Sequence, residues 1–237
     1  MTIQFANIQW HNNQPHSLDF NDVYFNSEDG LQETEYVFIA HNQLKQRFAA
    51  LENSHFIIIE TGFGSGLNFL AVAAHWLALS PLSAKLHYIS IEKFPLKLAD
   101  LVRAQTSWPQ FSNISNEFAQ HYTKLIAENN SFNLAESRIQ LSLQVDDVLH
   151  ALSLISQKAD AWLLDGFAPV KNAEMWSSEV FSHIARLSKS NTTFATFTSA
   201  GAVRRGLQAV GFEVQKHAGF GKKREMLAGV FKPRLVL

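Results

Sequence analysis

The stretch that most constrains the fold of this chain runs from Ile57 to Asn68 and reads IIIETGFGSGLN. Three β-branched residues lead into an acid and a threonine, three glycines follow at alternate positions, and a helical pattern of apolar residues begins at Phe69. This order predicts a buried strand, a tight glycine-rich turn and the N-terminus of a helix. Glycine in such a turn tolerates the required backbone angles and lets backbone N–H groups approach a ligand.

The spacing of the glycines favours one class of ligand over another. A dinucleotide fingerprint has the pattern G-x-G-x-x-G, but here Gly66 follows Gly64 by two and Leu67 stands where that pattern has its third glycine. Glu60, directly before the turn, would repel a pyrophosphate and suits a ligand with a cationic end. We therefore expect an S-adenosylmethionine site. A glycine-rich turn without a ligand and an NAD-dependent oxidoreductase are the alternatives.

Composition limits the class of protein. Of the 237 residues, 46% are hydrophobic and 17% are charged, which is enough apolar material for a sizeable core. The formal net charge of −1 means that any surface for nucleic acid must be local. The absence of cysteine excludes disulfides, thiolate zinc sites and a cysteine nucleophile within this chain. The sequence shows no pattern of a signal peptide or a membrane span, so we expect a cytoplasmic protein.

Most of the chain alternates predicted strands and helices. Strands are expected near residues 56–60, 84–92, 138–145, 159–164 and 192–198. Helices are expected near residues 66–79, 96–106, 148–156, 175–187 and 200–210, and near 117–126 within an otherwise irregular segment, 107–137. Two closing strands, 212–216 and 226–231, have no helix between them and should pair antiparallel. These patterns predict an α/β fold with a mostly parallel, Rossmann-like sheet, helices on both faces and an antiparallel edge strand.

Residues 1–50 do not resemble the start of such a unit. We interpret them as an N-terminal extension or lid on a domain formed by residues 51–237, with plain surface decoration as the alternative. Within this segment, residues 22–25 are a strand candidate, residues 33–39 are a second strand or the start of a helix, and residues 42–51 have helical spacing.

Polar residues follow the predicted parallel strands, at the edge where open α/β sheets bind ligands. Glu92 ends the second strand, where an acid takes the ribose hydroxyls of a nucleotide. Asp146 and Asp147 follow the third strand, and successive side chains of an extended segment point in opposite directions. One of them could accept a hydrogen bond from an adenine amino group while the other caps the next helix, and we favour Asp147 for the ligand.

A second informative stretch, Asp165-Gly166-Phe167-Ala168-Pro169, follows the fourth predicted strand. Methyl transfer to nitrogen needs a free lone pair, and a carboxylate here can accept a proton from an amine. We therefore expect Asp165 to be catalytic and Phe167 to stack on a planar base, with a helix cap at Asp165 as the alternative. Lys171 and Trp176 could line the same pocket, although core packing is the more ordinary role for Trp176.

Basic residues gather near the end of the chain. They are Arg204, Arg205, Lys216, Lys222, Lys223 and Arg224. With Phe220 between two glycines, this distribution resembles a grip on a phosphate backbone, and solubilising charge is the alternative. The ten histidines show no metal-ligand spacing, so we expect no metal.

Together these segments resemble the methyltransferase half of the MnmC family of tRNA-modification proteins, whose members make 5-methylaminomethyl-2-thiouridine at the wobble position. The resemblance covers nearly the whole chain. The segments that carry it most clearly are residues 60–69 (ETGFGSGLNF), 164–169 (LDGFAP), 194–201 (FATFTSAG), 203–207 (VRRGL) and 219–226 (GFGKKREM).

The resemblance implies a class I S-adenosylmethionine-dependent methyltransferase that methylates the primary amine of 5-aminomethyl-(2-thio)uridine in the tRNA anticodon stem-loop. Cofactor contacts are then expected at Glu60, Thr61, Gly62, Gly64, Gly66, Asn68, Glu92, Lys93, Asp146, Asp147 and Asp165. Substrate contacts are expected at Gly166, Phe167, Lys171, Trp176, Arg204, Arg205, Lys222, Lys223 and Arg224. Bifunctional members of the family continue into an FAD-dependent oxidase, so FAD is expected only if such a domain exists outside this chain, fused or separate.

Two further interpretations stay open. One is an S-adenosylmethionine-dependent methyltransferase acting on another amine, in a protein or a small molecule. The other is a non-catalytic RNA-binding partner of a separate oxidase. The late basic residues distinguish a tRNA substrate from another amine, because they would hold its phosphates. A catalytic role for Asp165 would distinguish an enzyme from a non-catalytic partner.

Overall fold

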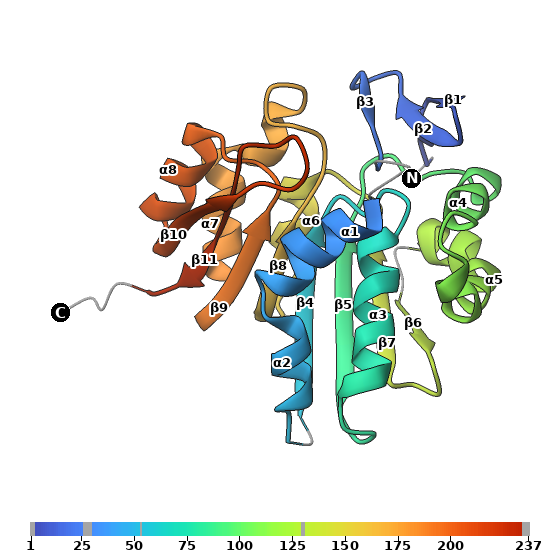
Figure 1. Cartoon of the computed structure of the whole chain (residues 1–237), viewed down its shortest axis with the longest axis horizontal. Helices are drawn as coiled ribbons and strands as arrows, with labels where there is room; N and C mark the ends of the chain where they lie inside the picture. Colours follow the sequence, from blue (N-terminus) through green and yellow to red (C-terminus); the bar gives the residue numbers. More distant parts are fainter. Residues whose placement is uncertain (1–2, 26–29, 53, 129–130, 234–237) are drawn as a thin grey trace.

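A computed structural model describes residues 3–25, 30–52, 54–128 and 131–233 of the chain (Figure 1). These residues form an eight-stranded sheet with helices on both faces, and a small three-stranded sheet near the N-terminus. No helix in these ranges is long and apolar enough to cross a membrane.

The large sheet has the strand order β10-β11-β9-β8-β4-β5-β7-β6. Its five central strands are parallel: β7 (Ile139–Gln144), β5 (Lys85–Ile91), β4 (His55–Thr61), β8 (Ala159–Leu164) and β9 (Ser188–Thr196). The antiparallel strands at its two edges are β6 (Ser131–Leu134) on one side, and β11 (Glu225–Phe231) and β10 (Phe212–Ala218) on the other. The predicted mostly parallel sheet with an antiparallel edge is confirmed, and β6 adds a second antiparallel edge.

Alternate residues of the central strands face two separate apolar layers. In β4, Ile58 belongs to one layer and Ile59 to the other, and in β8 Leu163 and Trp162 are divided in the same way. The first layer contains α2 (Leu44–Ala49), α3 (Leu67–Leu79), α4 (Leu98–Gln105) and α5 (Ser112–Glu128). The second contains α6 (Val148–Leu154), α7 (Ser178–Arg186) and α8 (Gly201–Ala209). Continuous apolar runs in these strands are therefore explained by burial of both faces of the sheet.

Two local predictions need correction. Residues 107–137 are not irregular around one short helix, because they form η2 (Pro109–Phe111), the long helix α5 and strand β6. Phe118 and Tyr122 of α5 are fully buried, so tertiary packing stabilises a helix whose polar sequence gives a weak pattern. The single helix predicted at 175–187 is divided into η3 (Ala173–Trp176) and α7, because the Ser177 hydroxyl accepts the Val180 N–H at 3.3 Å and caps a new helix.

The N-terminal segment has two parts. Strands β1 (Ile8–His11), β2 (Gln14–Ser17) and β3 (Asp22–Val23) form the small antiparallel sheet, so the strand candidate at 22–25 is only two residues long. Residues 33–39 are helical, in α1 (Gly30–Thr34) and the π-helical η1 (Glu35–Ala40), which was one of the two predictions for them. Val37, Phe38 and Ile39 of η1 are buried in the first apolar layer.

The small sheet is attached to α4 through one aromatic side chain. The Trp10 indole N–H donates to Asp100 Oδ1 at 2.8 Å, and the Arg103 guanidinium lies over the Trp10 ring at 4.0 Å from its centre. This hydrogen bond and cation–π contact hold the small sheet above the carboxyl ends of the parallel strands (Figure 1).

Contacts at that edge join the end of β4 to the ends of β5 and β8. The Gly62 N–H donates to Ile91 O at 2.8 Å, and the Thr61 hydroxyl donates to Asp165 O at 2.9 Å. Gly62 has φ +83°, and a Cβ on it would lie 2.9 Å from Gly166 Cα. Only glycine allows this approach, which sets the glycine turn against the loop that carries Asp165.

We predict that Gly62→Ala lowers the free energy of unfolding by at least about 2 kcal/mol, since left-handed strain and overpacking against the Gly166 backbone add. Gly221→Ala is the matched control, because Gly221 also has a positive φ, +58°, but a Cβ there meets no atom within 4 Å. That variant should lose only about 1 kcal/mol. Denaturant unfolding measures both losses, and equal losses would show that the Gly62–Gly166 contact contributes nothing.

Candidate active site

A cavity of about 1080 Å³ opens at the carboxyl edge of the parallel strands. Clefts that hold small ligands usually measure about 300–1,000 Å³, so this one has room for a nucleotide-sized ligand and part of a second molecule. Its walls come from the loops after β4, β5, β7 and β8, from residues 20–25 of the N-terminal segment and from the β10–β11 loop. Within the described ranges, no group of three or more histidine, aspartate or glutamate side chains could hold a metal ion.

Most of the predicted site residues line this cavity. They are Gly62, Gly64, Asn68, Glu92, Lys93, Asp146, Asp147, Asp165, Gly166, Phe167, Lys171, Lys222 and Lys223. The predicted residues that lie outside its lining are Glu60, Thr61, Gly66, Trp176, Arg204, Arg205 and Arg224. Of the residues outside the lining, Glu60 and Thr61 are buried in strand β4, whereas Arg205 and Arg224 are exposed on the outer surface.

The glycine turn places backbone at the cavity wall. Gly62, Gly64 and Gly66 have φ values of +83°, +54° and +76°, which side-chain-bearing residues rarely adopt. Gly66 directly precedes α3, and a Cβ on it would lie 2.9 Å from the Phe63 ring. Glycine at this third position is therefore required by packing, whereas the first two glycines face the cavity.

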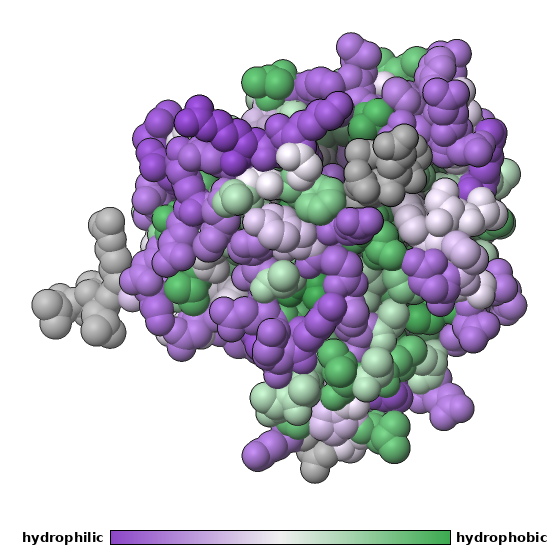
Figure 2. Space-filling view, in the orientation of Figure 1, coloured by the Kyte–Doolittle hydropathy of each residue, from purple (hydrophilic) through white to green (hydrophobic). Residues whose placement is uncertain are grey.

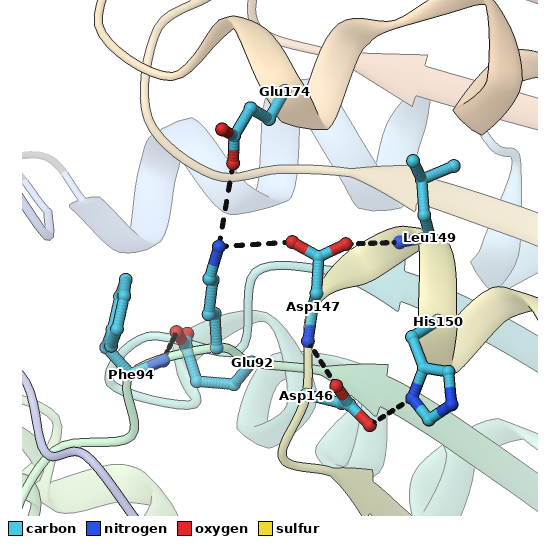
Figure 3. Close-up of polar contacts among 8 residues, drawn as sticks. Glu92, Phe94, Asp146, Asp147, Leu149, His150 and Glu174 are labelled. Carbon is cyan, nitrogen blue, oxygen red and sulfur yellow. Dashed lines mark hydrogen bonds and ion pairs between the residues drawn. The ribbon is translucent and has the colours of Figure 1, made fainter.

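Glu92, just after β5, has a carboxylate held by backbone N–H groups. Its Oε2 accepts from Gly64 at 2.9 Å. Its Oε1 accepts from Phe94 at 3.0 Å (Figure 3). Burial raises the pKa of Glu92, and the two backbone donors act in the opposite direction. Each oxygen has a second lone pair, so the group can still accept hydrogen bonds from a pair of ligand hydroxyls.

Asp147 lines the cavity and also caps the helix that follows it. Its Oδ1 caps α6 by accepting the Leu149 N–H at 3.0 Å, and its Oδ2 accepts from Lys93 Nζ at 3.1 Å. Asp146 Oδ1 accepts the Asp147 N–H at 2.7 Å, and its Oδ2 pairs with His150 Nδ1 at 2.6 Å (Figure 3). Asp147, which we favoured as the ligand contact, is therefore also the helix cap. A ligand amino group would have to share the Asp147 oxygens with the Leu149 N–H and Lys93.

Asn68 joins two carboxyl groups at the floor of the cavity. Its Nδ2 donates to Asp165 Oδ2 at 2.7 Å and to Glu60 Oε1 at 3.0 Å. Its Oδ1 accepts from the Thr34 hydroxyl at 2.8 Å. The Ser90 hydroxyl donates to Glu60 Oε2 at 2.7 Å. Because both ends of the amide are engaged, the orientation of Asn68 is fixed.

Burial raises the pKa of both carboxyl groups. Burial raises the pKa of Glu60 to about 8, and the charge of Asp165 adds to this rise while hydrogen bonds from Ser90 and Asn68 oppose it. Burial also raises the pKa of Asp165 to about 6, against the hydrogen bonds from Gly166 N–H and Asn68. Glu60 is fully buried and lies outside the lining of the cavity, so its side chain does not itself face a ligand bound there.

Phe167 contacts the N-terminal segment. Its ring stacks on Phe20 with centres 4.5 Å apart, and Tyr24 meets it edge-on at 5.4 Å. Lys171 Nζ pairs with Asp22 Oδ1 at 3.2 Å and so ties the same segment to the loop after β8. Sequence reasoning missed Phe20 and Tyr24, because nothing in their spacing indicates that they lie over the end of a strand distant in the sequence.

Trp176 lies beside the cavity, in the second apolar layer. It is 9% exposed, and its indole N–H donates to Phe167 O at 3.2 Å. This position agrees with the core-packing role that the sequence also allowed. Trp176 therefore supports the loop that follows Asp165 and does not form a wall of the cavity.

The late basic residues are divided between the cavity and the outer surface. Lys223 lines the cavity, where its Nζ bonds Glu33 Oε1 at 2.5 Å and lies 4.4 Å from the centre of the Phe197 ring. Lys222 lines it as well, whereas Arg224 and the α8 residue Arg205 are exposed outside it. Figure 2 shows hydrophilic side chains gathered over α8 and β10.

We predict that stability falls as the pH rises from about 4 to about 8. The pKa values of Glu60 and Asp165 are raised from 4.5 and 3.8, so both groups stabilise the fold when protonated, and this contribution is lost as the pH passes the folded-state pKa values. Glu60→Gln cannot ionise and should remove the part of the loss above about pH 6. Thermal unfolding of both proteins at pH 6 and pH 9 measures this difference, and parallel curves would contradict it.

Comparison with known proteins identifies relatives of the chain. A relative from Methylobacillus flagellatus, named tRNA 5-methylaminomethyl-2-thiouridine biosynthesis bifunctional protein MnmC, is 50% identical over 226 residues, which are 95% of this chain and 35% of the relative. A protein of the same name from Chromobacterium violaceum is 48% identical over 230 residues, 97% of this chain and 35% of the relative. The chain thus spans about a third of the length of these relatives.

A solved structure and a family model agree with this relationship. The crystal structure of MNMC2 from Aquifex aeolicus superposes with a TM-score of 0.77 at 20% identity, covering 97% of this chain and 71% of that one, which shows a shared fold. The family model described as "S-adenosyl-L-methionine-dependent methyltransferase" matches residues 109–232, more than half of the chain. The chain belongs to this S-adenosyl-L-methionine-dependent methyltransferase family.

Proposed function

We propose that this chain transfers a methyl group from S-adenosylmethionine to the primary amine of 5-aminomethyl-(2-thio)uridine at the tRNA wobble position, giving 5-methylaminomethyl-(2-thio)uridine. The observation that carries the proposal is the Asp165 carboxylate, which lines the cavity beside the glycine turn. Its pKa of about 6 leaves it largely ionised, and therefore basic, at neutral pH. The names of the relatives supply the substrate.

The cavity suits the methyl donor. Glu92 would take the ribose hydroxyls, Asp147 the adenine amino group, and the backbone of Gly62 and Gly64 the remainder of the molecule. A Cβ on Gly64 would lie 3.3 Å from the Tyr24 ring and narrow this space, which favours glycine there. When bound, S-adenosylmethionine supplies a methyl carbon attached to a positively charged sulfur.

Asp165 would prepare the amine for attack. The substrate ammonium gives one proton to the Asp165 carboxylate, and the nitrogen lone pair then forms the new N–C bond while the C–S bond breaks with its electron pair left on sulfur. The positive charge moves from sulfur to nitrogen, and Asp165 returns its proton to water. Hydrogen bonds from Gly166 N–H at 2.8 Å and Asn68 at 2.7 Å hold the carboxylate during this exchange.

Basic side chains beside the cavity would hold the tRNA backbone. Lys222 and Arg224 lie on the β10–β11 loop, Arg205 lies on α8, and none of the three forms an ion pair with another described residue. Lysine and arginine side chains that are free of acidic partners can neutralise phosphates without first breaking an ion pair.

The relatives are named bifunctional and are about three times as long as this chain. An FAD-dependent oxidase, fused to this chain or separate from it, would supply the aminomethyl substrate. We place this activity in the cytoplasm, where tRNA modification takes place. Residues 1–50 would act as an N-terminal extension of the domain formed by residues 51–237, with Phe20 and Tyr24 beside the cavity.

We predict that Asp165→Asn lowers kcat for methyl transfer to tRNA by about 100-fold or more, because the amide cannot take the ammonium proton. The affinity for S-adenosylmethionine, measured by calorimetry, should change by no more than about threefold. Glu174→Gln, at the exposed rim of the same cavity, is the matched control and should keep the wild-type rate. Near-normal turnover by the Asp165 variant would remove this residue from the mechanism.

We predict that the double variant Lys222→Glu/Arg224→Glu binds tRNA at least about 10-fold more weakly at physiological salt. The slope of log affinity against log salt should become shallower by about 1–2, because tRNA binding releases fewer counterions when phosphate contacts are lost. Lys124→Glu, an exposed change on α5, is the control and should leave the slope unchanged. An unchanged slope in the double variant would place the tRNA elsewhere.

A further inference from the structure

Glu60 is a buried carboxyl group that the proposed methyl transfer does not use. It has no exposed surface, and it lies one layer below the cavity, at the end of β4. Among the described residues, no lysine, arginine or histidine forms an ion pair with it. A buried acid without a cationic partner is costly to ionise, so its presence calls for a role other than that of a counter-ion.

The contacts of Glu60 lead directly to Asp165. Both N–H groups of the Asn68 amide are used, one on each carboxyl group, at 3.0 Å to Glu60 and 2.7 Å to Asp165. Two carboxylates that share one neutral donor and no cation repel each other, so only one of them ionises readily. Asp165 faces the cavity and is hydrogen-bonded to Gly166 N–H, whereas Glu60 is sealed in the core, so the charge belongs on Asp165.

A protonated Glu60 has a hydrogen-bond acceptor at hand. The Ser90 hydroxyl on β5 donates to Glu60 Oε2 at 2.7 Å when the acid is ionised, and the same hydroxyl can rotate to accept from the carboxyl O–H when Glu60 is protonated. The other titratable group beside Glu60 is Tyr88, also on β5, which is fully buried and stays neutral because burial raises its pKa further. Around Asp165 the charged groups are Glu33 of α1 and Lys223 of the β10–β11 loop, which are paired with each other.

We propose that Glu60 is a positioning residue for Asp165, which in its protonated form holds the Asp165 carboxylate toward the substrate amine through the Asn68 amide. This inference rests on the proposed function. With Glu60 neutral, the amide is free to donate its shorter bond to the charged Asp165 oxygen. When Glu60 loses its proton at high pH, a second negative charge stands on the other side of the Asn68 amide and repels the Asp165 carboxylate, so Asp165 loses its fixed position and kcat falls.

The first test compares three proteins in the methyl-transfer assay. Glu60→Ala should lower kcat by about 10-fold or more, because Asn68 loses its second anchor. Glu60→Gln has the shape and donor pattern of the protonated acid, so it should rescue kcat at pH 7 to within about threefold and abolish the decline of kcat above about pH 8. Equal losses in the two variants, or an alkaline decline that persists in Glu60→Gln, would overturn the proposal.

The second test needs no substrate. Infrared spectroscopy of the ligand-free protein at pH 7 should show the C=O band of a protonated carboxyl group that is missing in Glu60→Gln and present in Glu174→Gln, whose carboxyl is exposed. Absence of this band from the wild-type protein would show that Glu60 is ionised and would overturn the proposal. Full turnover by Asp165→Asn would contradict the proposed role of Asp165 in methyl transfer, whether or not the infrared band of Glu60 is present.

Discussion

Two carboxyl groups from neighbouring strands share one amide, and the candidate active site is organised by that contact. Asn68 is the second residue of α3, just after the glycine turn, and its Nδ2 reaches both Glu60 at the end of β4 and Asp165 after β8. The glycine turn and the Asp165 carboxylate are therefore set at a fixed separation by one side chain. The Gly62–Gly166 backbone approach reinforces the same spacing from the loop side.

The parallel sheet supplies the rest of the site by geometry alone. Strands β5, β4 and β8 are neighbours in the sheet and end at the same edge, so Glu92, the glycine turn and Asp165 meet although they are far apart in the sequence. The N-terminal segment and the β10–β11 loop then cover the edge, through the Phe20–Phe167 stack and the Lys223–Glu33 pair. The side of the cavity that carries Glu92, the glycine turn and Asp165 is thus built by the sheet, and the opposite side by segments added to it.

The sequence was most informative where a local pattern has a direct physical cause. The run from Ile57 to Asn68 predicted a strand, a turn and a helix, because β-branched residues, alternate glycines and helical apolar spacing each favour one local structure. The acids after each strand were predicted to meet, since parallel strands end together. Their partners were not predictable in this way: the sharing of Asn68 by Glu60 and Asp165 depends on burial and on a side-chain rotamer. The position of Phe20 over the cavity depends on contacts across about 150 residues of chain, for which no local pattern exists.

The most direct test of the central claim is incubation of this protein with labelled S-adenosylmethionine and tRNA that carries 5-aminomethyl-(2-thio)uridine, followed by nucleoside analysis. Our account predicts that the label appears in 5-methylaminomethyl-(2-thio)uridine and that the aminomethyl nucleoside is consumed in equal amount. Label in a different nucleoside, or an unlabelled tRNA beside a protein that binds S-adenosylmethionine, would contradict it.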